Sequence, residues 1–91
     1  MSFSGANLDS VNFSGANLTG ATMGGVSLRN ANLTGASFRG ADLSGANLEG
    51  SNLTNADFTD ADLIAANLKR TVQTGLIVTG AKLADTQGLE S

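Results

Sequence analysis

The stretch from Ala31 to Leu48, ANLTGASFRGADLSGANL, repeats one five-residue phrase almost without error. In each phrase Ala comes first, a small polar residue second and Leu or Phe third, and each complete phrase ends on Gly. The same frame can be followed from the first residues to about Leu83, where sixteen of seventeen central positions are apolar and Gln73 is the exception. A fixed period of this kind indicates a repeat architecture, so the fold has to be argued from the repeat.

A period of five excludes the two commonest regular backbones. Around an α-helix, residues five apart would lie about 140° from one another and would form no stripe. In a flat strand, residues five apart point to opposite faces. The chain must therefore turn once per phrase, at the Gly, Asn or Asp two positions after each centre, because these residues tolerate positive φ. If each turn is a right angle, four phrases close a square coil of twenty residues.

Residues twenty apart give independent support for this coil. Phe38 and Phe58 have this spacing, and the position after the centre holds residues of alternating charge, Asp9, Arg29, Glu49 and Lys69. Stacked coils lie about 4.8 Å apart, so these four residues are predicted to form a ladder of opposite charges. Side-chain ladders between coils are also expected for Asn7–Asn47–Asn67, Asn12–Asn32–Asn52 and the hydroxyl row Ser14, Thr34, Thr54 and Thr74.

The phrase of Ala, then Asn or Asp, then Leu or Phe, then two variable residues resembles the motif of pentapeptide repeat proteins. The resemblance is clean over residues 1–70 and looser over 71–85. It implies an all-β fold, a right-handed four-sided parallel β-helix of about four coils. We therefore expect one solenoid domain over residues 1–85, in which 71–85 form an irregular last coil, followed by a C-terminal tail at 86–91.

The composition excludes several classes of protein. The chain of 91 residues has no Cys and no His, which removes disulfides, thiol catalysis and zinc fingers. Its net charge of −3, with five Lys and Arg, argues against nucleic-acid binding through a basic surface. No apolar run approaches the length of a membrane span and no signal peptide precedes the repeats, so the chain as given is expected to be soluble and cytoplasmic.

Four carboxylates are the candidate site for chemistry. They share one corner region of the predicted square, with two of them twenty residues apart: Asp42, Asp57, Asp60 and Asp62. Calcium loops need six to eight oxygens at particular spacings, which this set does not match, and acid–base catalysis needs a pocket that a convex rod does not offer. We interpret these residues as structural, with a partner-facing acidic patch as the alternative, and we predict no catalytic residue, metal or cofactor.

The function predicted from these features is a non-enzymatic structural or protein–protein interaction module whose partner is unknown. The family resemblance implies an alternative, because some pentapeptide repeat proteins mimic duplex DNA and act on DNA gyrase. A rod of about four coils with a net charge of only −3 is short and weakly acidic for such a mimic. The resemblance also implies a bacterial source, with cyanobacteria as a frequent one.

The ends of the rod are predicted to mediate self-association. A stack of coils presents an open strand edge and a cross-section of its core at each end, and such edges invite pairing unless they are blocked. We expect a homodimer through the N-terminal layer, formed by Phe3, Leu8, Phe13 and Leu18. The alternative is the apolar C-terminal coil, where Leu76, Ile77 and Val78 interrupt the phrase.

Overall fold

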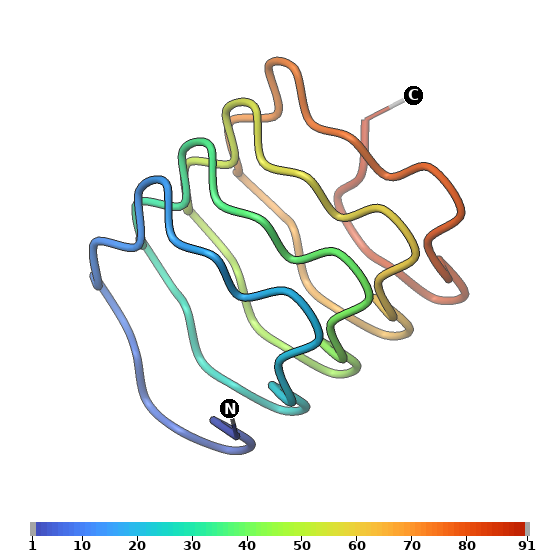
Figure 1. Ribbon diagram of the computed structural model, residues 1–91, viewed down its shortest axis with the longest axis horizontal. Coiled ribbons are helices and arrows are strands. Elements are labelled where there is room, and N and C mark those ends of the chain that lie inside the picture. The colour runs from blue at the N-terminus through green and yellow to red at the C-terminus, as the bar shows by residue number, and fades with distance from the viewer. Residues whose placement is uncertain (1, 91) are drawn as a thin grey trace.

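The chain winds into a right-handed, four-sided coil whose turns stack into a short rod (Figure 1). In this computed structural model, which describes residues 2–90, the rod measures 28 × 20 × 20 Å. The described residues contain no helix, and their paired backbone consists of 14 single-residue parallel bridges. Every bridge joins residues twenty apart, from Ser2 with Thr22 to Asn67 with Gln87, so the predicted coil of twenty residues is confirmed.

The turns fall where the sequence predicts them. From residue 5 to residue 85, every fifth residue has a positive φ, between 56° and 77°. The slot holds Ser10, Ala65 and Arg70 at the three places where Gly, Asn and Asp are absent, and these adopt the same left-handed conformation. The geometry of the coil therefore overrides local preference at these three corners, at a cost of about 1–2 kcal/mol each.

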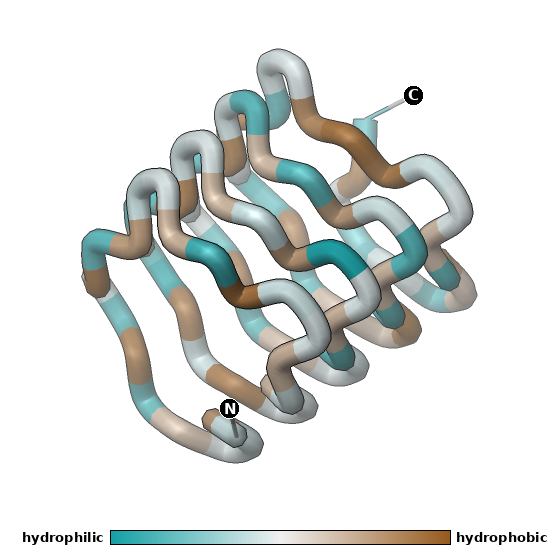
Figure 2. The backbone as a smooth tube through the Cα atoms, viewed as in Figure 1, coloured by the Kyte–Doolittle hydropathy of each residue, from teal (hydrophilic) through white to brown (hydrophobic). Residues whose placement is uncertain are grey.

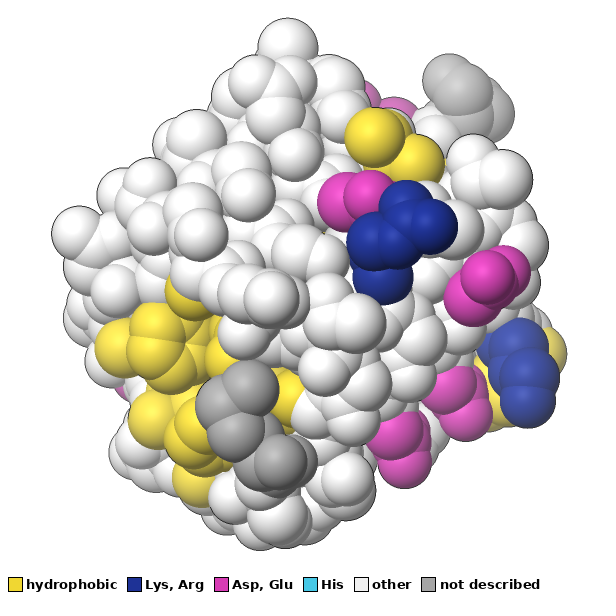
Figure 3. All heavy atoms as spheres, in the orientation of Figure 1, with side chains coloured by type: hydrophobic (Ala, Val, Ile, Leu, Met, Phe, Trp, Pro, Cys, Tyr) yellow, Lys and Arg dark blue, Asp and Glu magenta, His cyan; other side chains and the backbone are white. Residues whose placement is uncertain are grey.

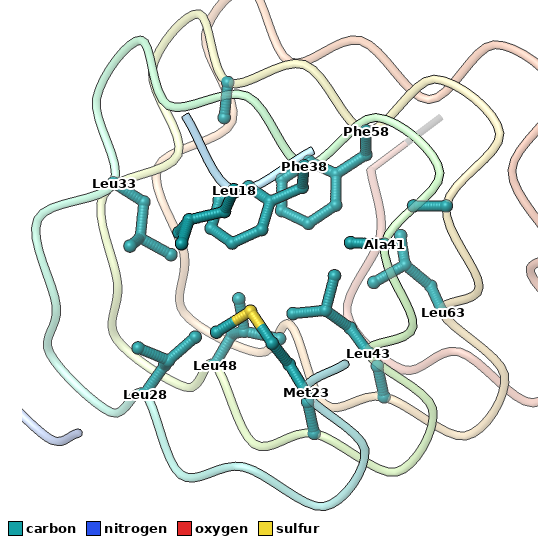
Figure 4. Close-up of a cluster of buried hydrophobic side chains, with 14 of the residues drawn as sticks. Leu18, Met23, Leu28, Leu33, Phe38, Ala41, Leu43, Leu48, Phe58 and Leu63 are labelled. Atoms are coloured by element: carbon teal, nitrogen blue, oxygen red, sulfur yellow. The ribbon is translucent and has the colours of Figure 1, made fainter. Parts of the chain in front are cut away.

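The core is a stack of central residues and Ala side chains, several of which Figure 4 shows pointing into the coil. Figure 2 shows the matching alternation of hydrophobic and hydrophilic residues along each coil. Phe38 and Phe58 lie face to face in adjacent coils, with ring centroids 4.7 Å apart and an interplanar angle of 15°. Met23 lies among the central Leu residues and is fully buried. Each phrase therefore contributes one large and one small side chain to the interior.

The backbone hydrogen bonds of one phrase, Ala46–Gly50, explain what each position does. The N–H of Ala46 closes the preceding turn, and that of Asn47 donates to the coil before it. The N–H groups of Leu48 and Gly50 donate to the coil after it. Only the N–H of Glu49 has no backbone acceptor, and it donates to Asn47 Oδ1 at 3.1 Å.

This local bond replaces the predicted ladders of Asn side chains. All ten Asn and Asp residues in the slot before the centre accept the N–H of the residue two positions later, at 2.9–3.1 Å. Within residues 2–90 no side-chain hydrogen bond joins one slot Asn to another, nor the hydroxyls of Ser14, Thr34, Thr54 and Thr74, so the prediction of these ladders is wrong. A buried or half-buried N–H without an acceptor is costly, and the slot carboxamide or carboxylate removes that cost within the phrase.

The C-terminal coil keeps the backbone register although its side chains depart from the phrase. Bridges continue at Val72, Ile77, Lys82 and Gln87. The polar centre Gln73 donates from Nε2 to the Gly88 carbonyl at 2.8 Å and accepts the N–H of Glu90 at Oε1 at 2.9 Å. Residues 88–90 therefore fold over this end, where Leu89 packs against the core.

Within residues 2–90, no helix has the length and apolarity needed to cross a lipid bilayer.

Candidate interaction surfaces

The four candidate carboxylates lie around one corner of the rod. Asp57 belongs to one face, Asp60 occupies the turn, and Asp62 begins the next face, where it is bridged to Asp42 in the preceding coil. Asp42, Asp57 and Asp62 also serve the backbone, because each accepts the N–H of the residue two positions later. The structure therefore brings the predicted residues into one region and gives a fold-stabilising role to three of them.

Basic side chains interrupt this acidic region. Arg39 forms an ion pair with Asp57, with Nη1 3.0 Å from Oδ2. Lys82 follows Asp62 in the same column, and its positive charge contributes to lowering the pKa of Asp42. Exposed pairs of this kind are worth about 0–1 kcal/mol, so their main consequence is a mixed surface potential. Figure 3 shows this mixture, with basic and acidic side chains next to one another on the right-hand side of the view.

Hydrogen bonds hold three Asp side chains in their charged form. The Ser44 backbone N–H and hydroxyl lower the pKa of Asp42, and the Thr59 hydroxyl and N–H lower that of Asp57. The Ser27 hydroxyl and the Arg29 N–H lower the pKa of Asp9. Among residues 2–90 there is no cluster of His, Asp or Glu that could hold a metal ion and no enclosed cavity.

The lowered pKa values predict a loss of stability in acid. A carboxyl whose folded pKa lies below its unfolded value of 3.8 stabilises the fold above that pH, and the stabilisation is lost as the pH falls through the folded pKa. We expect the melting temperature to be nearly constant down to about pH 5 and to fall below about pH 4. The Asp42→Asn/Asp57→Asn variant keeps one acceptor oxygen at each position but has no carboxyl to protonate there, so its melting temperature should fall less in acid. An acid decline of melting temperature equal to that of the wild type would contradict the assignment of this stabilisation to Asp42 and Asp57.

The predicted ladder of alternating charges is only partly realised. Asp9, Arg29, Glu49 and Lys69 do share one column, but the carboxylate of Asp9 accepts the backbone N–H of Arg29 at 3.0 Å. Ser27, which stands where most phrases have Asn or Asp, cannot supply that acceptor, so Asp9 supplies it from the coil before. Glu49 instead pairs with Arg70 across the corner. Neither of the two ion pairs among residues 2–90 thus joins two members of the predicted ladder.

Three large apolar side chains are exposed on the C-terminal half of the rod. Val72 is 48% exposed, Ile77 42% and Ile64 36%. Of the three residues predicted for this end, Ile77 faces outward, whereas Leu76 and Val78 are half-buried against the core. Ile64 and Val72 were not predicted as surface residues, although each is an apolar residue in a slot that elsewhere holds small or polar side chains.

The N-terminal end exposes part of the core. Phe3, Leu8 and Phe13 are half-buried, and Figure 3 shows apolar side chains gathered on the face beside the N-terminus. Phe3 and Phe13 lie with ring centroids 6.4 Å apart across this layer. Leu18 is only 4% exposed, because the rising coil has already covered it, so the predicted end layer has three members and not four.

Comparison with known proteins gives one family. The model of pentapeptide repeats matches residues 2–35 and 36–72, with eight copies. A comparison with curated proteins found no match.

Solved structures with the same coil include proteins from plants and cyanobacteria. A pentapeptide repeat protein of the Arabidopsis thaliana thylakoid lumen is 28% identical with a TM-score of 0.91, over 99% of this chain and 65% of that chain. A pentapeptide repeat protein of Nostoc Pcc 7120 is 36% identical with a TM-score of 0.81, over 82% of this chain and 62% of that chain. The chain thus spans somewhat less than two thirds of the length of these relatives.

One further solved structure, QnrB1, is described as a plasmid-mediated fluoroquinolone resistance protein. It is 20% identical, with a TM-score of 0.77, over 93% of this chain and 49% of that chain. At this identity the likeness concerns the fold alone.

Proposed function

Because this chain belongs to the pentapeptide repeat family and its own outward positions are varied, we propose that it is a non-enzymatic protein–protein interaction module. The observation that carries the proposal is the division of labour within each phrase. Inward positions hold mostly Ala, Leu and Phe, whereas the position after the centre varies among Ser, Thr, Gly, Ala, Asp, Glu, Arg, Lys and Ile. The faces of the rod can therefore change without disturbing the core, as a recognition surface requires.

Affinity capture from the source cell tests this proposal. The bait should be compared with a Val72→Ser/Ile77→Ser variant, which removes the two most exposed apolar side chains and leaves the core unchanged. We expect one or more proteins to be captured by the wild type and lost with the variant, since apolar contacts dominate binding energy at interfaces. Identical capture by both baits would place recognition on another face, and capture of no protein at any bait concentration would count against the module.

Self-association is the second part of the proposal. Phe3, Leu8 and Phe13 offer a partly exposed apolar layer at the N-terminal end, whereas residues 88–90 fold over the C-terminal end. We expect light scattering during gel filtration to show a homodimer at high micromolar concentration, and we expect Phe13→Asp to dissociate it. Dissociation by Ile77→Asp alone, with the fold intact, would assign the interface to the C-terminal coil. A monomer at these concentrations would refute the homodimer.

DNA mimicry of gyrase is the alternative function, favoured only by the column of Asp42 and Asp62. Arg39 and Lys82 lie within the same region and reduce its negative charge. We therefore predict no effect on gyrase supercoiling at concentrations where a strong mimic inhibits. Inhibition that disappears when Asp42, Asp57, Asp60 and Asp62 are all changed to Asn would instead establish the mimic.

Location and source remain predictions for this chain. Its relatives include a protein of the thylakoid lumen as well as cyanobacterial proteins. A cytoplasmic location and a bacterial source are part of the proposal, and fractionation of the source cell checks the location, for which recovery in a lumenal fraction would be the contrary result.

A further inference from the structure

Within residues 2–90, the N-terminal edge of the rod is a row of backbone groups that have no hydrogen-bond partner among the described residues. In the coils that follow, slot residues such as Asn32, Asn47 and Asn52 donate their N–H to one neighbouring coil, and their carbonyls accept from it. The slot residues of the first coil are Ser2, Asn7, Asn12 and Asn17. Each is bridged to the second coil, but the hydrogen bonds of these bridges are made by the residues next to it in the sequence. Among the described residues, none of their own N–H or C=O groups is hydrogen-bonded to the backbone. Such an edge is a template for another strand.

This edge is suited to a second copy of the same chain. An antiparallel pair of hydrogen-bonded residues needs a free N–H and a free C=O on both partners, which is what each slot residue of the first coil offers. Rotation by 180° about an axis perpendicular to the rod turns one N-terminal edge onto the other and reverses its strand direction. The facing strands are then antiparallel, and the contact is closed and two-fold, as in most homodimers.

The rise of the coil fixes the register of such a dimer. A coil of twenty residues climbs about 4.8 Å, so the edge is a ramp that is lowest at Ser2 and highest at Asn17. Two identical ramps meet evenly only where the low part of one faces the high part of the other. We propose, on the basis of the homodimer above, that Asn7 pairs with Asn12 of the second copy and Ser2 with Asn17, each exchanging two backbone hydrogen bonds.

Other registers leave groups unpaired. If Asn12 faced Asn12 of the second copy, Ser2 would have to face Thr22, which is already covered by Ser2 of its own chain. If Asn7 faced Asn7, the strand at Asn17 would face no strand. Only the proposed register matches every free slot residue with another free one.

The only charged side chain of residues 2–20, that of Asp9, does not block this edge. Asp9 lies at the corner through which the two-fold axis would pass. Its carboxylate is turned toward the second coil, where it accepts from the Ser27 hydroxyl and the Arg29 N–H. Phe3, Leu8 and Phe13 would meet their counterparts across the interface as adjacent coils do within the rod.

The expected affinity is modest. The two shorter dimensions of the rod, 20 and 20 Å, limit the end face to roughly 400 Å² per copy. About 800 Å² in total is below the ~1,200–2,000 Å² of stable standard interfaces, so we expect a dimer that forms in the micromolar range and dissociates on dilution.

Disulfide trapping tests the register, because the chain has no Cys of its own. Hydrogen-bonded antiparallel pairs have Cα atoms about 5.5 Å apart, within the ~4.4–6.8 Å that a disulfide needs. Asn7→Cys and Asn12→Cys should be made as single variants, mixed and mildly oxidised. The mixture should give a covalent dimer in up to half of the material, and either variant alone should give almost none. Circular dichroism and melting of each variant confirm that the coil is intact.

A matched control uses the same slots two coils further along. Mixed Asn47→Cys and Asn52→Cys chains should give no covalent dimer, because these residues lie away from the edge. A covalent dimer from Asn12→Cys alone would overturn the register, as would a wild-type dimer by light scattering that no mixture can trap. A wild-type monomer at high micromolar concentration would refute the homodimer itself.

Discussion

Leu48→Lys is expected to abolish cooperative folding, whereas Thr54→Lys is expected to leave the fold intact. Leu48 is fully buried, with the equally buried Leu28 and Leu68 before and after it in the same column. A lysine there would place an unpaired ammonium among apolar side chains, which costs several kcal/mol even after relaxation. A domain of this size is stable by only about 5–15 kcal/mol, so one such charge removes much of the margin.

Melting followed by circular dichroism measures the difference. Thr54 is on the outside of the coil, where a lysine side chain reaches water, so Thr54→Lys should keep a cooperative transition. Leu48→Met is the control for the position itself and should cost less than about 1.5 kcal/mol, because the volume is nearly conserved. Equal loss of cooperativity in the two lysine variants would show that the assignment of inward and outward positions is wrong.

The coil could be predicted because one physical requirement repeats at every phrase. A large apolar residue every fifth position has to be buried, and only a turn in the same sense after each phrase allows it. The five-residue period predicts the corners, the column of Phe38 and Phe58 and the coil length, all of which the structure confirms. Handedness came from the family resemblance, because a period alone is compatible with either hand.

The contacts made by polar side chains could not be predicted in the same way. Asn7, Asn47 and Asn67 stand in one column, but each binds the N–H two residues later and none binds the next coil. A period tells which residues are stacked and says nothing of which backbone groups lack a partner. Only the full set of backbone hydrogen bonds shows that the N–H after a centre lacks a backbone acceptor and is bonded instead by a side chain, in most phrases by that of the same phrase.

Two departures from the phrase have a similar cause. Ser51 stands in an Ala slot and is fully buried, yet its hydroxyl accepts the Ala31 N–H at 3.0 Å and donates to the Leu28 carbonyl. It thus replaces the direct turn bond of the coil before it. Gln73 is the polar centre that binds Gly88 and Glu90 through its amide. Sequence alone shows both as irregularities, and the hydrogen bonds supply their roles.

The sequence predicts where the candidate surfaces lie on the rod, but not which contacts their individual side chains make. The corner of Asp42, Asp57, Asp60 and Asp62 follows from the twenty-residue period. The ion pair with Arg39 does not, since a long side chain can reach several columns. A flat end layer would include Leu18. Because the coil rises, Leu18 lies deeper in the rod than the three central residues before it and is buried.

A Gly50→Ala substitution is expected to destabilise the chain by more than the same change at Gly45. Both glycines have a positive φ, 77° at Gly50 and 67° at Gly45, so both substitutions place an alanine in the left-handed region at about 1–2 kcal/mol, partly offset by lower entropy of the unfolded chain. The space around them differs. A Cβ at Gly45 would meet nothing, whereas a Cβ at Gly50 would overlap Asn30 Oδ1.

The overlap arises from a rule that the structure shows three times. Wherever Asn or Asp occupies a turn and another coil follows, the turn of the next coil is Gly and the side chain lies over it: Asn30 over Gly50, Asn55 over Gly75 and Asp60 over Gly80. Gly50→Ala must therefore move the side chain of Asn30 as well as strain its own backbone. We expect Gly45→Ala to cost about 1 kcal/mol and Gly50→Ala about 2–3 kcal/mol, a further fall in melting temperature of roughly 4–15 °C.

A double-mutant cycle separates the two contributions. Asn30→Gly removes the overlapping side chain, so Gly50→Ala in that background should cost no more than Gly45→Ala does. The coupling between residues 30 and 50 should then be about 1–2 kcal/mol, as is usual for residues in direct contact. Additive effects of the two substitutions, or equal costs at positions 45 and 50, would show that Asn30 moves aside freely and that the corner Gly is required only for its backbone conformation.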